Sequence, residues 1–139
     1  MTIEEKDRQT LIDYRIKKSK DAEEDARFLY DNDKLHLAVN RIYYAVFYIL
    51  SALALKECFQ TRKHQQLIGW FNKKYVKEGI IDKTFGQFVH KTYDERSQAD
   101  YADYVEFEKQ EVSVMMDKLN ALIAKIEGLI HQNDDEREG

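Results

Sequence analysis

The stretch VNRIYYAVFYILSALAL, residues 39–55, decides how this chain folds. It is apolar on every face of a helix, and such a helix lies either in the middle of a protein or in a membrane. The apolar run between Arg41 and Lys56 is shorter than the about 20 residues that a bilayer requires. We therefore expect the central helix of a soluble bundle, ending near Cys58, and no contact with a membrane.

A narrow polar seam is expected along one side of this otherwise apolar helix. Arg41, Tyr44 and Tyr48 are spaced by three and four residues, so they share that face. Tyrosine hydroxyls need hydrogen-bond partners when they are buried. We favour a structural interpretation, in which a buried Arg41 pairs with a carboxylate of another helix, over a binding role.

Composition indicates an all-helical globular protein in one domain. The 139 residues include no proline and only five glycines, with 43% hydrophobic and 35% charged residues. We expect one domain over residues 1–139 with its core at about 11–131. The net charge of −4 excludes a bulk basic field for nucleic acid, so any RNA contact must be local. The lone cysteine and the lack of an apolar signal region at the N-terminus favour the cytoplasm.

Apolar periodicity predicts an up-and-down antiparallel bundle of four long helices and a shorter one. The first is expected at about residues 11–30 and the shorter one at about 64–77, where Gly79 ends it. Four helix starts carry side chains that can cap them, namely Asp33, Thr61, Asp82 and Asp103, the last in a capping box with Glu106.

The sequence holds few groups that could carry chemistry. Its four histidines lack any metal-ligand spacing, so neither a metal nor another cofactor is predicted; they are His36, His64, His90 and His131. We expect His64, after Arg62 and Lys63, to be a surface or capping residue rather than a catalytic one.

The segment ERSQADYADY, residues 95–104, is the second candidate site. Arg96 falls on the stripe of the fourth helix that holds Phe85, Val89, Thr92 and Ala99, where an arginine is unexpected. A guanidinium close to a helix N-terminus makes an anion or phosphate site. The structural alternative, which we favour, is an Arg–Asp ion pair beside an N-cap, because ion-pair networks give the same pattern.

The motifs together resemble the HEPN domain (higher eukaryotes and prokaryotes nucleotide-binding). The resemblance covers roughly residues 21–130 and rests on NRIYYAVF at 40–47, on His64 at a helix start, and on Glu95-Arg96 to Asp100-Tyr101. It implies a helical bundle that forms homodimers, which an apolar central helix also favours. Many such domains are toxins of prokaryotic toxin–antitoxin pairs, and the usual partner is a minimal nucleotidyltransferase antitoxin.

The resemblance also implies a catalytic site in which one expected residue, a histidine, is missing. Active members are metal-independent ribonucleases that carry Arg, four to six residues, then His, at a dimer cleft. Arg96 matches the arginine, but Tyr101, Ala102 and Asp103 stand where His should be. A tyrosine is a poor general base because its unperturbed pKa is about 10. The antitoxin of some members modifies a tyrosine two positions after the His, where this chain has Asp103, with Tyr104 one further on.

The candidate catalytic positions are Arg96 and Tyr101, and the candidate binding positions are Arg41, Tyr44, His64, Asp100 and Tyr104. The prediction is a toxin-like component of a toxin–antitoxin pair that binds RNA or a nucleotide, with feeble cleavage. One alternative is an active metal-independent endoribonuclease, for which His64 is the only replacement base that we can name. The other alternative is a non-catalytic protein-interaction module.

Overall fold

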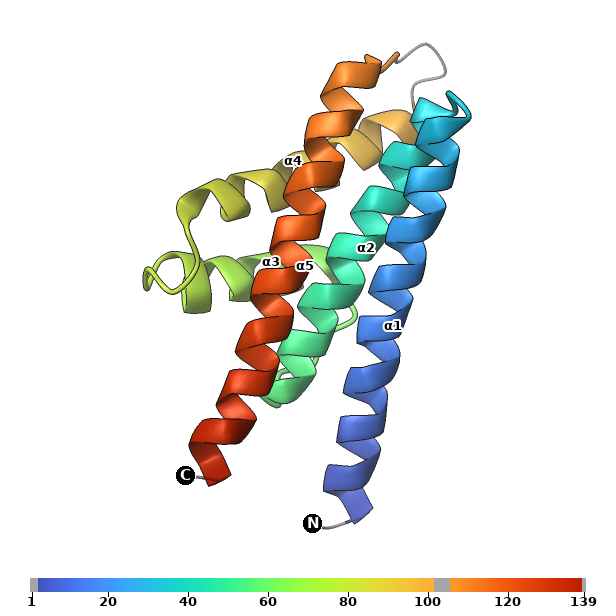
Figure 1. Ribbon diagram of the computed structural model, residues 1–139. Coiled ribbons are helices and arrows are strands. Elements are labelled where there is room, and N and C mark those ends of the chain that lie inside the picture. The colour runs from blue at the N-terminus through green and yellow to red at the C-terminus, as the bar shows by residue number, and fades with distance from the viewer. Residues whose placement is uncertain (1–2, 102–105, 139) are drawn as a thin grey trace.

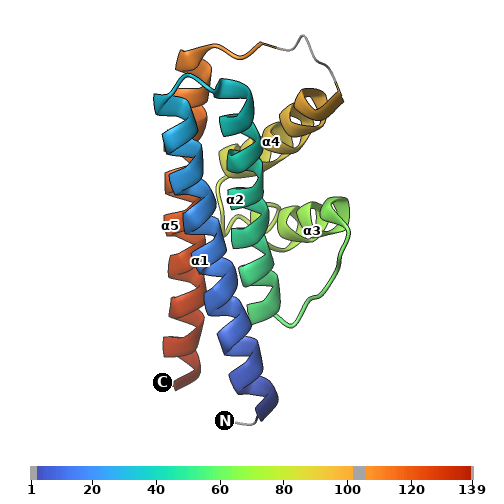
Figure 2. The same cartoon turned by 90° about the vertical axis from the view of Figure 1, so that its right-hand side faces the viewer.

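The computed structural model describes the backbone of residues 3–101 and 106–138, and the side chains of residues 4–96 and 106–132. All of its regular elements are helical: α1 (Ile3–Asp31), α2 (Leu35–Lys56), α3 (His64–Phe71), the π-helix η1 (Asn72–Val76), α4 (Lys83–Tyr101) and α5 (Lys109–Glu138). The predicted all-α bundle of four long helices and a shorter one is therefore confirmed. Helices α1, α2 and α5 lie side by side, with α1 running opposite to the other two (Figure 1). Helices α3 and α4 lie on the side of α2 away from α1 (Figure 2).

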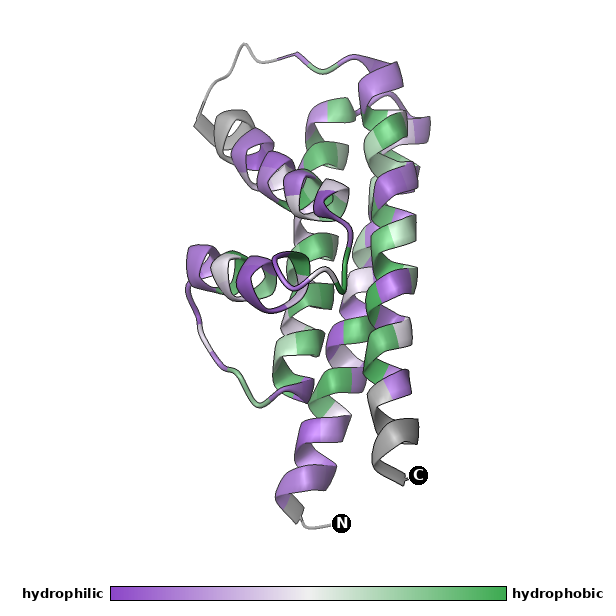
Figure 3. Cartoon of the chain, turned by 90° about the vertical axis from the view of Figure 1, so that its left-hand side faces the viewer, coloured by the Kyte–Doolittle hydropathy of each residue, from purple (hydrophilic) through white to green (hydrophobic). Residues whose placement is uncertain are grey.

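Helix α2 is the buried centre of the bundle, as predicted. It contacts α1, α3, α4 and α5. Twelve of its 22 residues are buried, and they are Ala38, Val39, Ile42, Tyr43, Ala45, Val46, Ile49, Leu50, Ala52, Leu53, Ala54 and Lys56. Apolar residues follow the length of α2, whereas the first turns of α1 are hydrophilic (Figure 3). By length and composition alone α2 could cross a membrane. Its burial by four neighbouring elements is what the core helix of a bundle shows instead.

Small residues bring α1 close to α2. Ser19, Ala22 and Ala26 are between 0 and 3% exposed, as their spacing predicted. The Ser19 hydroxyl donates a hydrogen bond to the Ala45 carbonyl at 2.6 Å, which contributes about 1 kcal/mol to stability. Larger side chains at these positions would push the two helices apart.

The first helix begins earlier than predicted and the second lacks its predicted cap. Helix α1 starts at Ile3 rather than near residue 11, and Glu4 and Glu5 in its first turn suit the positive end of the helix dipole. The predicted N-cap role of Asp33 is wrong. Its φ of +61° belongs to the turn, Lys34 takes the N-cap position, and the Asp33 carboxylate accepts a hydrogen bond from Lys109 at 2.7 Å.

Two later helix starts also differ from the prediction. Lys63, not Thr61, is the N-cap of α3, while the Thr61 hydroxyl accepts a hydrogen bond from the Lys63 N–H within the preceding turn. Residues 106–108 are not helical, and α5 begins at Lys109. The predicted start of this helix directly after Asp103 is therefore wrong. Asp103 itself lies outside the described residues. Asp82 does cap α4, accepting a hydrogen bond from the Thr84 N–H at 3.3 Å.

The shorter helix changes its winding before it ends. It is α-helical only to Phe71, and the next five residues form the π-helix η1. Tyr75 in η1 is 5% exposed, lies 6.2 Å from the Phe71 ring, and donates a hydrogen bond to Glu57 at 3.1 Å. Gly79 follows with a φ of +79°, as its predicted role in ending the helix requires.

We predict that Ala26→Leu destabilises the protein by about 1–3 kcal/mol, because the added atoms have no room between α1 and α2. Ala124→Leu, which adds the same atoms at an exposed position of α5, should change stability by no more than about 0.5 kcal/mol. Urea unfolding followed by circular dichroism measures both. Equal effects of the two substitutions would show that the contact between α1 and α2 is not tight.

Candidate functional site

Arg96 is positioned by the buried face of α4. Val89 and Thr92 are fully buried, and the Thr92 hydroxyl donates a hydrogen bond to the Val89 carbonyl at 2.8 Å. These two residues hold α4 against the bundle. One turn later the same stripe presents Arg96, half-buried, to α2.

The Arg96 guanidinium lies across two tyrosines of α2. Its Nη2 donates a hydrogen bond to the Tyr44 hydroxyl at 3.0 Å. Its Cζ lies 5.3 Å from the centre of the Tyr43 ring and 5.5 Å from that of Tyr44, which is within the range of a cation–π interaction. Arg96 thus connects α4 with α2 through a hydrogen bond and two aromatic faces.

Tyr43 also connects α2 with the start of α3. Its hydroxyl forms a short hydrogen bond with Nδ1 of His64. Burial raises the pKa of Tyr43, so the hydroxyl keeps its proton, and His64 is its only partner among the described residues. Burial, and then the nearby Arg96 charge, lower the pKa of His64. We therefore assign a neutral His64 whose Nδ1 accepts from Tyr43 and whose proton is on Nε2.

Arg41 adds a second guanidinium beside Tyr44. Its Cζ lies 4.9 Å from the Tyr44 ring centre, and its Nε and Nη2 donate to the Asn40 amide oxygen at 3.4 and 3.2 Å. Tyr44 is in turn 6.2 Å from Tyr48, so the predicted polar face of α2 exists. Among the described residues Arg41 does not pair with a carboxylate, contrary to the structural interpretation of this face.

Further rings surround this arrangement. Phe47 stacks on the His64 imidazole with ring centres 4.0 Å apart, and Tyr93 of α4 lies 6.0 Å from Tyr43. We call the five central residues the Arg96 cluster; they are Arg41, Tyr43, Tyr44, His64 and Arg96. It combines two fixed cations, a neutral imidazole and aromatic faces, which is chemistry suited to an anion that carries a planar group.

The structure brings together four of the predicted site residues: Arg41, Tyr44, His64 and Arg96. The side chains of Asp100, Tyr101 and Tyr104 lie outside the described residues. Whether Arg96 faces a cleft stays a prediction, because the side chains of residues 97–105 next to it are also outside. Sequence reasoning missed Tyr43 as a member of the site, since its link to both His64 and Arg96 is a contact between helices. Within the described residues no three metal-ligating side chains gather.

Comparison with known proteins gives consistent matches. The family model of the HEPN domain matches residues 12–129. A "UPF0332 protein" of Thermotoga maritima is 36% identical over 124 residues, which are 89% of this chain and 94% of that protein. A Methanocaldococcus jannaschii protein named "Putative toxin MJ0142" is 29% identical over 110 residues, 79% of this chain and 75% of that protein.

We predict that His64 makes the protein less stable at acidic pH. Its pKa in the folded state lies below the ordinary value of about 6.5 that the unfolded chain retains. Below about pH 6.5 the unfolded state therefore binds more protons, and the free energy of unfolding falls as the pH falls; above that pH the effect disappears.

Urea unfolding between pH 7.5 and 5.0 measures this loss. In His64→Asn, whose amide oxygen can still accept from Tyr43, the decline should be shallower than in the wild type. His131→Asn removes an exposed histidine of α5 and should not make it shallower. Parallel curves for the wild type and His64→Asn would contradict the assignment of His64.

Proposed function

We propose that this chain, which belongs to the HEPN domain family, is a toxin-like protein that binds RNA or a nucleotide through the Arg96 cluster. The relatives named as toxins support the toxin-like character. One observation carries the binding role: the guanidinium groups of Arg96 and Arg41 both lie within 5.5 Å of the Tyr44 ring centre.

Two neighbouring guanidinium groups can bind a phosphate group. A guanidinium donates two parallel hydrogen bonds to phosphate oxygens, and those charge-assisted bonds are stronger than neutral ones. Nucleobases stack on aromatic side chains, which the tyrosines of the cluster supply. Because the whole chain carries a net charge of −4, attraction of RNA would depend on this local group and not on a general basic surface.

Cleavage by this site is expected to be feeble. General acid–base groups typically contribute 10²–10⁴-fold, and the histidine that should follow Arg96 is replaced. His64 does not simply take its place. With Nδ1 occupied by Tyr43 and the proton on Nε2, a neutral His64 offers a hydrogen-bond donor and not a base. Arg96 could still stabilise charge on a phosphate, so binding would persist where cleavage fails.

The position of His64 also favours a second candidate, an active metal-independent endoribonuclease. His64 lies on Tyr43, directly beside Arg96, and its lowered pKa keeps it neutral near pH 7. If substrate drew the Tyr43 hydroxyl away from Nδ1, that nitrogen would become an available base. Activity that depends on both His64 and Arg96 distinguishes this candidate from binding alone.

We further propose a homodimer in the cytoplasm with a nucleotidyltransferase antitoxin as its partner. Family membership supports these proposals, and a non-catalytic protein-interaction module is the alternative reading of the same surface. The partly exposed residues Arg41, Tyr44 and Tyr48 on α2 are a suitable contact face, since Tyr and Arg are enriched at interfaces. Sedimentation velocity at micromolar concentration tests the dimer, and a monomer would contradict it.

RNA binding and cleavage test the proposed function directly. Purified protein is incubated without metal ions with total RNA and transfer RNA, and binding is followed by fluorescence anisotropy of labelled RNA. We expect no robust cleavage. Arg96→Ala should weaken binding at least about tenfold, the loss of one charge-assisted hydrogen bond of about 1.5–3 kcal/mol. Arg96→Lys, which keeps the charge but loses the planar fork, should weaken it less.

The matched control is Arg27→Ala, which removes an exposed arginine of α1 beside Glu23. It should bind RNA as the wild type does. Because Arg96 connects α4 with α2, thermal unfolding must first show that each variant is folded. Robust cleavage that both Arg96→Ala and His64→Ala abolish would establish the endoribonuclease instead. Equal RNA binding by folded Arg96→Ala and wild type would contradict the binding site.

A further inference from the structure

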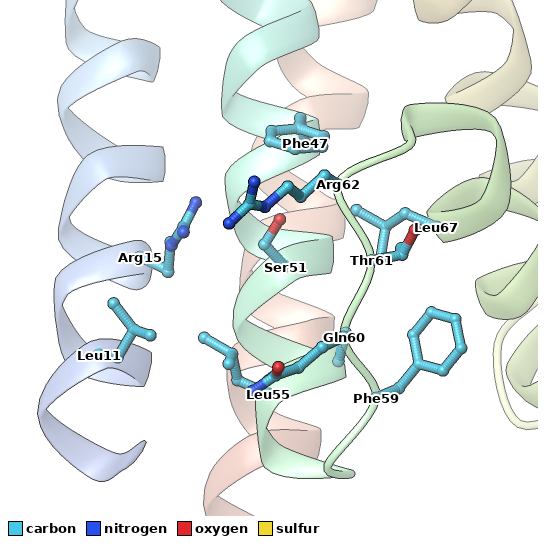
Figure 4. Close-up of a pocket in the computed structure, with 11 residues that line it drawn as sticks. Leu11, Arg15, Phe47, Ser51, Leu55, Phe59, Gln60, Thr61, Arg62 and Leu67 are labelled. Atoms are coloured by element: carbon cyan, nitrogen blue, oxygen red, sulfur yellow. The ribbon is translucent and has the colours of Figure 1, made fainter. Parts of the chain in front are cut away.

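A pocket of about 630 Å³ opens between α1, the second half of α2 and the segment that leads from α2 to α3. We call it the α2–α3 pocket (Figure 4). Its lining residues come from α1, α2, the connecting segment and the first turn of α3. Its volume lies within the 300–1,000 Å³ that is usual for small-molecule sites.

Two arginines from different elements meet in this pocket. Arg15 extends from α1 and Arg62 from the connecting segment, and both line the pocket together with Ser51 of α2 (Figure 4). Nε of Arg15 is buried and has no hydrogen-bond partner within the part of the chain that the structure describes. Two like charges in one pocket repel each other, and an unpaired guanidinium donor is costly. An oxyanion between the two guanidinium groups would offset their charge and accept hydrogen bonds from the N–H groups that line the pocket.

The rest of the lining is mainly apolar. Apolar side chains line the pocket around the arginines: Leu11 of α1, Phe47 and Leu55 of α2, and Phe59 and Leu67 beyond α2. An inorganic anion alone would leave this apolar surface uncovered. A ligand with an apolar body and one charged end would bury it and satisfy the arginines as well.

We propose that the α2–α3 pocket binds a small phosphate monoester or carboxylate that is attached to an aromatic or aliphatic body. The oxyanion lies between Arg15 and Arg62, and the body packs on Phe47 and Phe59. Arg96 does not line this pocket, so the site is separate from the Arg96 cluster. The two share one wall, because Phe47 also stacks on His64.

The single tryptophan of the chain provides a direct readout. Trp70 stacks on Phe59 with ring centres 5.2 Å apart and ring planes 7° from parallel. A ligand that contacts Phe59 should therefore change Trp70 fluorescence. Isothermal titration calorimetry measures the same binding if the fluorescence does not respond.

The probes are phenyl phosphate, phenylacetate, inorganic phosphate and benzyl alcohol, each titrated into the whole protein. Phenyl phosphate or phenylacetate should bind saturably, and the tighter of the two identifies the preferred oxyanion. Inorganic phosphate, which lacks the body, and benzyl alcohol, which lacks the charge, should each bind at least tenfold more weakly. Binding of benzyl alcohol as tight as that of both anions, or no saturable binding of either anion, overturns the proposal.

Single substitutions locate the site. Arg15→Gln and Arg62→Gln should each raise the Kd of the better anion at least tenfold, whereas Arg27→Gln on the same helix as Arg15 should not change it. Unchanged affinity in the first two variants would show that the anion binds elsewhere and would overturn the proposal.

The Arg96 cluster is tested separately in the same assay. Arg96→Ala should retain anion binding, and Arg15→Gln should retain RNA binding, so the two sites can fail independently. If transfer RNA displaces the bound anion and Arg15→Gln weakens RNA binding, the pocket belongs to an RNA surface. The small-molecule proposal would then be wrong.

Discussion

The burial of α2 by four helical neighbours is the constraint on which the rest of this structure depends. An all-round apolar helix must be covered on every side, and each cover fixes the place of another element. The small residues of α1 allow it to approach one side closely, with Ser19 bonded to the Ala45 carbonyl. On the opposite side of α2 lie α3 and α4. They contribute His64 and Arg96, which form hydrogen bonds with tyrosines of α2. The packing of α3 and α4 against α2, which completes the core, therefore also brings the residues of the site together.

Tyr43 shows how closely core and site are joined. It is 1% exposed and would count as a core residue by burial alone. Its hydroxyl nevertheless bonds to His64 of α3, and its ring faces Arg96 of α4. One side chain thus fixes the positions of groups from two other helices. Packing holds the side chains of such a site in place before a ligand binds. Binding therefore costs little additional side-chain conformational entropy.

Periodicity was sufficient for the fold but not for its details. The all-round apolar sequence of α2 and the apolar stripe of α4 predicted the bundle, because apolar burial depends on the spacing of residues along one helix. The predicted cap at Asp33 failed because a tertiary contact with Lys109 and a left-handed backbone competed for that residue. For the site, spacing placed Arg41 with Tyr44 and placed Arg96 on an inward stripe. Spacing could not show that His64 reaches Tyr43, since it describes one helix at a time and does not tell which faces of two helices meet.

The π-helix η1 gives its segment a tolerance for a change in length that the α-helical turns of α3 lack. A π-helical turn closes hydrogen bonds over five residues instead of four, so it accommodates one residue more than the α-helix it interrupts. Because the wider turn absorbs that residue locally, removing one residue between Phe71 and Val76 would restore α-helical winding and leave the later residues in about the same orientation. Removing one residue from the α-helical turns of α3 would instead turn every later side chain of the helix by about 100°. A change of one residue in length should therefore be tolerated better in η1 than in α3.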